Sequence, residues 1–147
     1  MENEAFFWRV MDLLNWNCAG DDSQVLAPAL RFLARRSDEE IFAFEDTMAR
    51  LLHNLDSRKI AQSLYKDTNS MSADLFLYQR CVAVVNGLAY YEAVRSGSTR
   101  LKPDLEFESV LYLPANAWAK KHRQAPEDYP HTPGISYESL MNQDLWK

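Results

Sequence analysis

The segment from Ser37 to Leu55 constrains the fold more than any other part of this sequence. Ser37 and Glu40 form the capping-box pattern of a helix start, in which each side chain accepts a hydrogen bond from the backbone N–H of the other residue. Successive residues of a helix are about 100° apart. At that spacing one face of the segment carries only large apolar side chains: Ile41, Phe44, Met48, Leu51, Leu52 and Leu55. We therefore expect a long amphipathic helix that buries this face against other helices.

Most of the remaining chain also has the apolar periodicity of helices. We expect further helices near residues 4–16, 23–35, 57–65, 73–94 and 115–122. Pro28 either lies near the start of the second of these or kinks it. The β-branched residues around 82–85 leave a buried strand as an alternative, but the length of the apolar segment favours a helix. That helix either passes through Gly87 or restarts after it, and residues 105–113 are predicted as a helix or a short extended stretch.

The tail from residue 124 is rich in residues that break helices, namely Pro126, Pro130, Pro133 and Gly134. We expect irregular structure there, with a last turn at 137–141. The tail also contains Tyr129, Tyr137 and Trp146. Because disordered segments are poor in aromatic residues, the tail is expected to fold back onto the helices.

Length and composition are those of one globular domain. The chain has 147 residues, of which 47% are apolar, and this is enough for one core. We expect an all-α fold, a compact bundle of about six or seven helices with an irregular C-terminal tail. The single domain is predicted to span 1–147, with a helical core at 4–122 and the tail 124–147 folded back on it.

Charge and targeting features narrow the classes of partner. The formal net charge of -5 argues against a nucleic-acid-binding role, because a phosphate backbone is bound by clustered Lys and Arg. Solubility is the ordinary explanation of an acidic surface, and a basic protein partner is the other. The start is acidic where a secretory signal would be basic, and no apolar run reaches the ~18 residues of a membrane span. We expect a cytoplasmic protein that binds no membrane.

The sequence contains no motif that indicates catalysis. Its histidines, His53, His122 and His131, are far apart in the sequence, and none stands in a nucleophile or metal motif. His53 and Asp56 have the spacing of two metal ligands on a helix, but no third ligand is apparent. Cys81 lies in an apolar run and is interpreted as a core thiol. We therefore expect no catalytic residue, no metal and no cofactor.

One ordered set of residues resembles the signature of a bacterial family called domain of unknown function 4240. The resemblance is carried by Ser72, Asp74, Phe76, Arg80, Gly87, Tyr91, Glu92 and Ala93. Phe7 and Trp8 resemble the aromatic pair at the start of that family, so the resemblance covers roughly residues 4–122. Asp74 and Arg80 lie on one predicted helix, where a buried or half-buried charge network is the structural interpretation. The alternative is a small helical enzyme, ligand-binding or regulatory domain with a pocket near Asp74 and Arg80.

Members that resemble this family occur as immunity proteins encoded beside polymorphic secreted toxins of Rhs type, which implies delivery by type VI secretion. The resemblance implies a cognate protein toxin as partner, with an ADP-ribosyltransferase as the expected class. We expect a monomer that forms a 1:1 heterodimer with the toxin and occludes its active site. Interfaces of this kind are anchored by a few aromatic and charged side chains, and the candidates are Asp38, Glu39, Asp104, Glu106, Glu108, Tyr129, Tyr137 and Trp146. For the acidic candidates, a solvated helix start is the competing interpretation.

Overall fold

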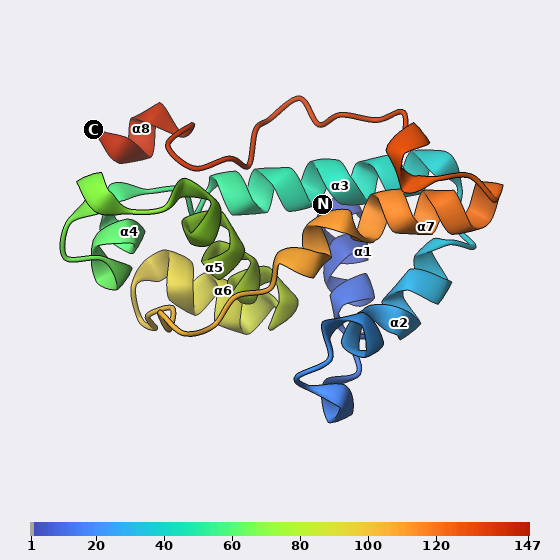
Figure 1. Ribbon diagram of the computed structural model, residues 1–147, viewed down its shortest axis with the longest axis horizontal. Helices are drawn as coiled ribbons and strands as arrows, with labels where there is room; N and C mark the ends of the chain where they lie inside the picture. Colours follow the sequence, from blue (N-terminus) through green and yellow to red (C-terminus); the bar gives the residue numbers. More distant parts are fainter. Residues whose placement is uncertain (1) are drawn as a thin grey trace. The chain divides into compact units, whose positions relative to one another are not determined.

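The computed structural model describes residues 2–147, and within these residues every regular element is a helix. The eight α-helices of this range are α1 (Glu2–Met11), α2 (Asp22–Leu33), α3 (Asp38–His53), α4 (Arg58–Leu64), α5 (Ala73–Val85), α6 (Leu88–Ser96), α7 (Leu113–His122) and α8 (Gln143–Trp146) (Figure 1). Short 3-10 helices cover Trp16–Cys18, Thr68–Ser70, Glu108–Tyr112 and Pro126–Asp128. The predicted all-α class is confirmed. None of the described helices is both long and apolar enough to cross a membrane.

The start of α3 has the predicted capping box. The Glu40 N–H donates to Ser37 Oγ at 3.2 Å, and the Ser37 N–H donates to Glu40 Oε1 at 3.3 Å. The predicted apolar face is buried, with at most 2% of any of its side chains exposed: Ile41, Phe44, Met48, Leu51, Leu52 and Leu55. Local sequence therefore determined both the start of this helix and the face that it buries.

Other helix boundaries differ from the predicted ones. The first helix ends at Met11, and a separate 3-10 turn follows in place of a continuation to residue 16. The predicted segment 73–94 consists of two helices, because Gly87 has a φ of 93° and caps the second one. This left-handed region is open to glycine at little cost. Pro28 lies inside α2, and residues 105–113 contain a 3-10 helix at Glu108–Tyr112, after which Leu113 begins α7.

Contacts within the described chain group into two units. The first contains residues up to Thr47 together with Ser109–Gly134, and the second contains Met48–Glu108 together with Ile135–Lys147. α3 contributes its beginning to the first unit and its end to the second. The number of independent domains stays a prediction.

The core of the first unit is aromatic. Phe7 of α1 stacks on Phe44 of α3 with ring centroids 4.8 Å apart, and Trp8 meets Phe7 edge to face at 5.0 Å. α7 packs against α2 and brings the buried Trp118 into this unit. Such aromatic pairs add to the stabilisation that comes from apolar burial.

The second unit is built around α5, which is buried on nearly all sides. Cys81, Ala83 and Val84 have no exposed surface. Because α5 buries residues on several faces, including Gln79 and Arg80, it needs several neighbours, and α6 is one of them. Burial raises the pKa of the Cys81 thiol to about 12, so the thiol stays protonated at neutral pH.

We expect Cys81 to be unreactive toward a thiol reagent such as iodoacetamide in the folded protein. Cys18 is only half-buried, so it should be alkylated at least about tenfold faster, since reactivity requires an accessible thiolate. Mass spectrometry of native and urea-unfolded samples measures both rates. Equal rates for Cys18 and Cys81 in the native protein would contradict the packing of α5.

Candidate functional site

The C-terminal segment of the second unit, residues 135–147, is held by one buried carboxylate. Asp56 follows the end of α3 and has no exposed surface. Its two oxygens accept hydrogen bonds from the backbone N–H groups of Leu140 at 2.9 Å, Met141 at 2.8 Å and Asn142 at 2.9 Å. The indole N–H of Trp146 donates to the same carboxylate at 2.7 Å. Charge-assisted hydrogen bonds of this kind are the strong ones, so Asp56 determines the backbone path of the segment.

A buried arginine holds the same segment from α5. Arg80 has no exposed surface, and its guanidinium donates to the backbone oxygens of Leu52 at 2.9 Å and Tyr137 at 3.0 Å, and to Ser139 Oγ at 2.9 Å. Burial lowers the pKa of Arg80 to about 10, and the charge of Asp56 opposes that shift. The guanidinium is therefore still protonated at neutral pH, and it ties the end of α3 to the C-terminal segment.

Side chains of the second unit also donate hydrogen bonds to the carbonyl groups in the last turn of α3. The last carbonyl groups of a helix have no partner within the helix. The hydroxyl of Tyr91 donates to the Leu51 oxygen at 2.7 Å, Arg80 donates to the Leu52 oxygen, and the side-chain amide of Asn142 donates to the His53 oxygen at 2.9 Å. Two residues of the family-like motif, Arg80 and Tyr91, thus cap α3.

Trp146 and Tyr137, both predicted as partner anchors, are engaged by their own chain. The Trp146 ring lies edge-on to Phe76 with centroids 6.2 Å apart, and the guanidinium of Arg58 lies 5.5 Å from its centre. Arg58 also donates to the Trp146 carbonyl at 2.6 Å. Both aromatic side chains are half-buried. The contacts of Trp146 hold the end of the segment in place.

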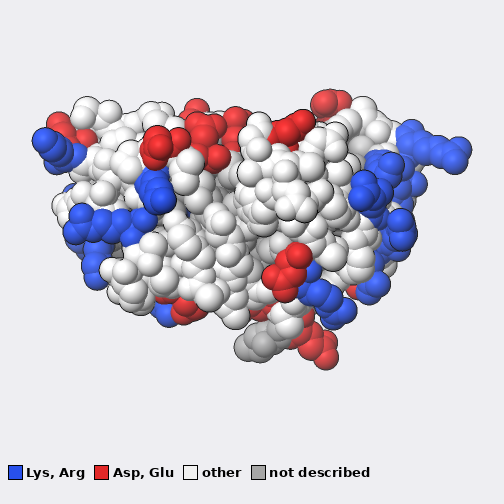
Figure 2. Space-filling model, turned by 90° about the horizontal axis from the view of Figure 1, so that it is seen from below, with Lys and Arg blue, Asp and Glu red and all other residues white. Residues whose placement is uncertain are grey.

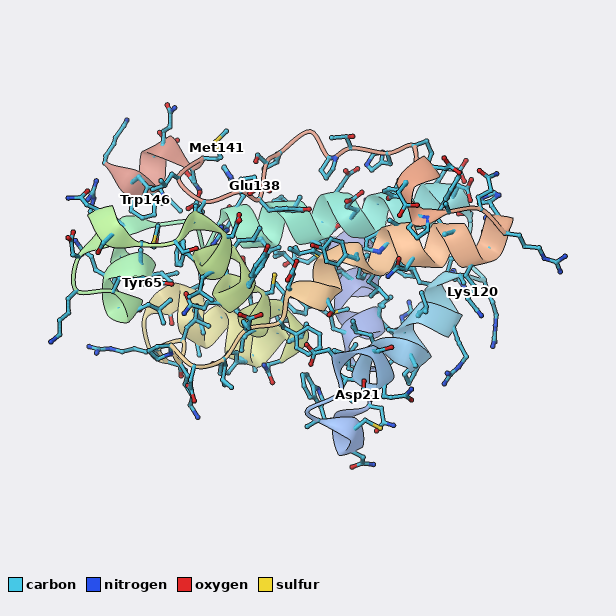
Figure 3. The ribbon with its side chains drawn as sticks, in the orientation of Figure 1. Asp21, Tyr65, Lys120, Glu138, Met141 and Trp146 are labelled. Atoms are coloured by element: carbon cyan, nitrogen blue, oxygen red, sulfur yellow. The ribbon has the colours of Figure 1, made fainter. Side chains whose placement is uncertain are left out.

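The outer side of the segment presents large apolar side chains to solvent. The exposed fractions are 42% for Ile135, 53% for Leu140, 54% for Met141 and 42% for Leu145. Figure 3 shows Met141 projecting away from the helices. Leu140 has a φ of 70°, a left-handed conformation that costs energy for a residue with a side chain. The segment is therefore a fixed, partly apolar surface, and sequence analysis did not identify these four side chains.

A turn lies at residues 139–140, within the predicted turn at 137–141. Asp56 accepts hydrogen bonds from the N–H groups of Leu140, Met141 and Asn142 at this turn, ahead of α8. Sequence analysis treated Asp56 only as a possible metal ligand beside His53. Among residues 2–147, no group of three or more His, Cys, Asp or Glu side chains is arranged to hold a metal ion.

The remaining residues of the family-like motif have local roles. Ser72 caps α5 by accepting from the Leu75 N–H at 3.2 Å, and Glu92 pairs with Arg95 at 2.7 Å. Asp74 is exposed, so its predicted place in a buried charge network is wrong. Arg80 is close to the charge of Asp56 instead, and it has no exposed surface with which to line an open pocket beside Asp74.

The predicted acidic anchors differ in their exposure to solvent, and one of them forms ion pairs. Asp38 lies in the first unit and pairs with Lys121 at 2.7 Å and His122 at 2.8 Å. These hydrogen bonds, that of Lys121 first, hold the pKa of Asp38 below its usual value. Glu39 is exposed. In the second unit Asp104 and Glu106 are exposed, whereas Glu108 is half-buried.

Tyr129, the third predicted aromatic anchor, packs inside the first unit. Its ring lies edge-on to Phe42 at 5.7 Å and to Trp118 at 6.0 Å. Burial, and then the nearby charge of Glu45, raise the pKa of the Tyr129 hydroxyl. His131 stacks on Phe42 at 4.8 Å and contacts Asp46 through Nε2 at 2.7 Å. Tyr129 therefore joins residues 126–134 to α3 and α7.

Comparisons with known proteins give one match. The model of a family described as "Protein of unknown function (DUF4240)" matches residues 1–120. No match was found among curated proteins or among solved structures. The matched range includes Asp56, Arg80 and Tyr91 and ends before the segment that Asp56 and Arg80 hold.

Proposed function

The chain belongs to the family of proteins of unknown function DUF4240, and from this premise we propose that it is an immunity protein. It binds a cognate secreted antibacterial toxin in the cytoplasm and covers the active site of that toxin. The expected toxin is an ADP-ribosyltransferase of Rhs type, bound as a 1:1 heterodimer. The observation that carries the proposal is the exposed apolar side of residues 135–147.

A surface of this kind favours protein binding for two reasons. Single exposed apolar residues are common, but four of them in one short segment indicate an interaction site. The backbone beneath them is already fixed by Asp56 and Arg80. A fixed backbone loses little conformational entropy on binding, so more of the contact energy remains as affinity.

The negative charge of the segment and of the whole chain supports an ADP-ribosyltransferase toxin as the partner. Glu138 and Asp144 lie among the apolar side chains of the segment, and the whole chain has a formal charge of -5. An enzyme that binds a dinucleotide substrate needs basic groups around the phosphates of that substrate. Acidic groups on an inhibitor complement such a site, which raises the association rate and the specificity.

We expect Met141→Asp and Leu145→Asp each to weaken toxin binding by about 30-fold or more, because a charge placed in the centre of an interface costs about 2 kcal/mol or more. Leu88→Asp is the matched control, since Leu88 is 47% exposed in the same unit but lies on α6. Isothermal titration calorimetry with the toxin domain encoded beside this chain measures the affinities.

A growth assay tests the function separately from the surface. Cells that express the toxin domain should survive when wild-type chain or Leu88→Asp is co-expressed, and should die with Met141→Asp. If the wild-type chain neither binds nor protects at micromolar concentration, the proposed function is wrong. If it protects and both substitutions leave affinity unchanged, the function stands and the assigned surface is wrong.

A further inference from the structure

The second unit contains a hollow whose charge is opposite to that of the whole chain. It has a volume of about 290 Å³ and is formed by α4, the C-terminal end of α6 and the loop that follows α6. Three cations line it, namely Lys59, Arg95 and Arg100, and no acidic residue is part of its lining. Figure 2 shows Lys and Arg at both ends of the view, and the group at the left end lies where α4 and α6 are. In a chain with a formal charge of -5, this concentration of positive charge is a local feature.

Two of the three cations are not neutralised. Arg95 is paired with Glu92 at 2.7 Å. Within the part of the chain that the structure describes, neither Lys59 nor Arg100 forms an ion pair, and both side chains are exposed. Two unpaired like charges that line the same hollow repel each other, and an anion between them would remove that repulsion.

The backbone of the hollow keeps Lys59 close to it. Gly97 ends α6 with a φ of 88°, and a Cβ atom at this position would lie 3.4 Å from Lys59 Nζ. The ammonium group therefore rests against the end of α6, where the helix dipole favours positive charge. Lys59 is thereby placed beside the hollow.

The remaining lining suits a small polar ligand with a carbon skeleton. Ser63, Thr99 and Gln62 supply hydroxyl and amide groups, and the nearly buried Val94 and Leu101 supply apolar surface. A few placed polar groups above an apolar floor are typical of small-molecule sites. The volume is at the lower end of the range for such sites, which limits the ligand to a small molecule.

From this lining we propose that the hollow between α4 and α6 is a binding site for a phosphate group. Two uncompensated positive charges match the two negative charges of a phosphate monoester better than the single charge of a carboxylate. Arg100 can donate two parallel hydrogen bonds to phosphate oxygens, and Lys59 adds a point charge. The phosphate is either free inorganic phosphate or part of a small phosphorylated metabolite. This site is independent of the proposed immunity function and of residues 135–147.

Amide chemical shifts of the isotopically labelled full chain test the proposal. Inorganic phosphate, ribose 5-phosphate and acetate are titrated separately at constant ionic strength, with chloride as the reference anion. We expect phosphate to shift the amides of Gly97, Thr99 and Arg100 in a saturable manner, and chloride and acetate not to. Tighter binding of ribose 5-phosphate than of phosphate identifies a phosphorylated metabolite as the source, and equal binding identifies free phosphate.

Matched variants assign the effect to the two cations. The double variant Lys59→Gln with Arg100→Gln should bind phosphate about tenfold more weakly or worse, because charge-assisted hydrogen bonds are lost. Lys102→Gln removes an exposed charge from the same unit outside the hollow, and should bind within about twofold of wild type. Both positions of the double variant are exposed, so the amide spectrum outside the hollow should be unchanged. Equal shifts in phosphate and chloride, or equal affinities of the double variant and Lys102→Gln, would overturn the proposal.

Discussion

Arg80→Ala is expected to lower the free energy of unfolding by about 3–5 kcal/mol, the cost of removing one member of a buried charged network. The substitution removes the guanidinium donor from the Leu52 and Tyr137 oxygens and from Ser139 Oγ, and the Leu52 oxygen keeps only the Leu55 N–H at 3.1 Å. It also leaves the buried charge of Asp56 without the compensating charge of the guanidinium. A total stability of about 5–15 kcal/mol is usual for a domain, so this loss would be a large fraction of it.

Urea denaturation followed by circular dichroism measures the change, and Arg80→Met separates its causes. Methionine fills much of the arginine volume but donates no hydrogen bond, so the difference between the Ala and Met variants reports the cavity. We expect Arg80→Met to remain at least about 2 kcal/mol less stable than wild type, because Asp56 stays buried. A Met variant as stable as wild type would show that the hydrogen bonds of Arg80 contribute nothing net.

Asp56→Asn is expected to cost about 3 kcal/mol and to release the C-terminal segment. The carboxylate accepts from three backbone N–H groups and the Trp146 indole. An amide has only one oxygen, so two of these donors would meet an N–H₂ group in place of an acceptor. Each buried donor without a partner costs about 1–3 kcal/mol. Hydrogen exchange at Leu140, Met141 and Asn142 should therefore accelerate much more than exchange at the centre of α5.

Asp67→Asn provides a matched control in the same unit. Asp67 is exposed and accepts from the Asn69 N–H at 2.9 Å, so its loss should change stability by no more than about 1 kcal/mol. If Asp56→Asn leaves exchange at residues 140–142 at the wild-type rate, the carboxylate does not hold the segment. The double variant Asp56→Asn with Arg80→Met tests whether the two residues act together. We expect its loss of stability to be smaller than the sum of the losses of the two single variants, because both residues fix one segment.

The hydrogen bonds that fix residues 135–147 connect the stability of the protein with its proposed function. Asp56 contacts the inner side of the segment, whereas Met141 and Leu145 are on its exposed side. We infer that Asp56→Asn weakens toxin binding without altering any side chain at the interface, since the free segment would lose conformational entropy when it binds. From the sequence we expected Tyr129, Tyr137 and Trp146 as the aromatic anchors. In the structure the rings of Tyr129 and Trp146 pack against other aromatic rings of this chain, and all three residues are half-buried, so their role as anchors stays a prediction.

Local sequence determined the helices that have a strong start signal and one apolar face. The clearest case is α3, since Ser37 and Glu40 lie three residues apart and the apolar residues that follow share one side. Ser57 and Ser72 cap α4 and α5 in the same way. A capping hydrogen bond joins residues three positions apart, so it can be read from the sequence without knowledge of the fold.

Tertiary structure alone decided the partners of the charged groups. Arg80 and Tyr137 are 57 positions apart, and Asp56 and Met141 are 85 positions apart. Lys59 and Arg100 reach one hollow from α4 and from the loop after α6. Helical periodicity repeats every few residues and tells which face is apolar, but it contains no information about which distant backbone group will face a given side chain. The helices of this protein could therefore be predicted from its sequence. The hydrogen bonds of Asp56 and Arg80 to the C-terminal segment and the basic hollow arise only when distant segments pack together.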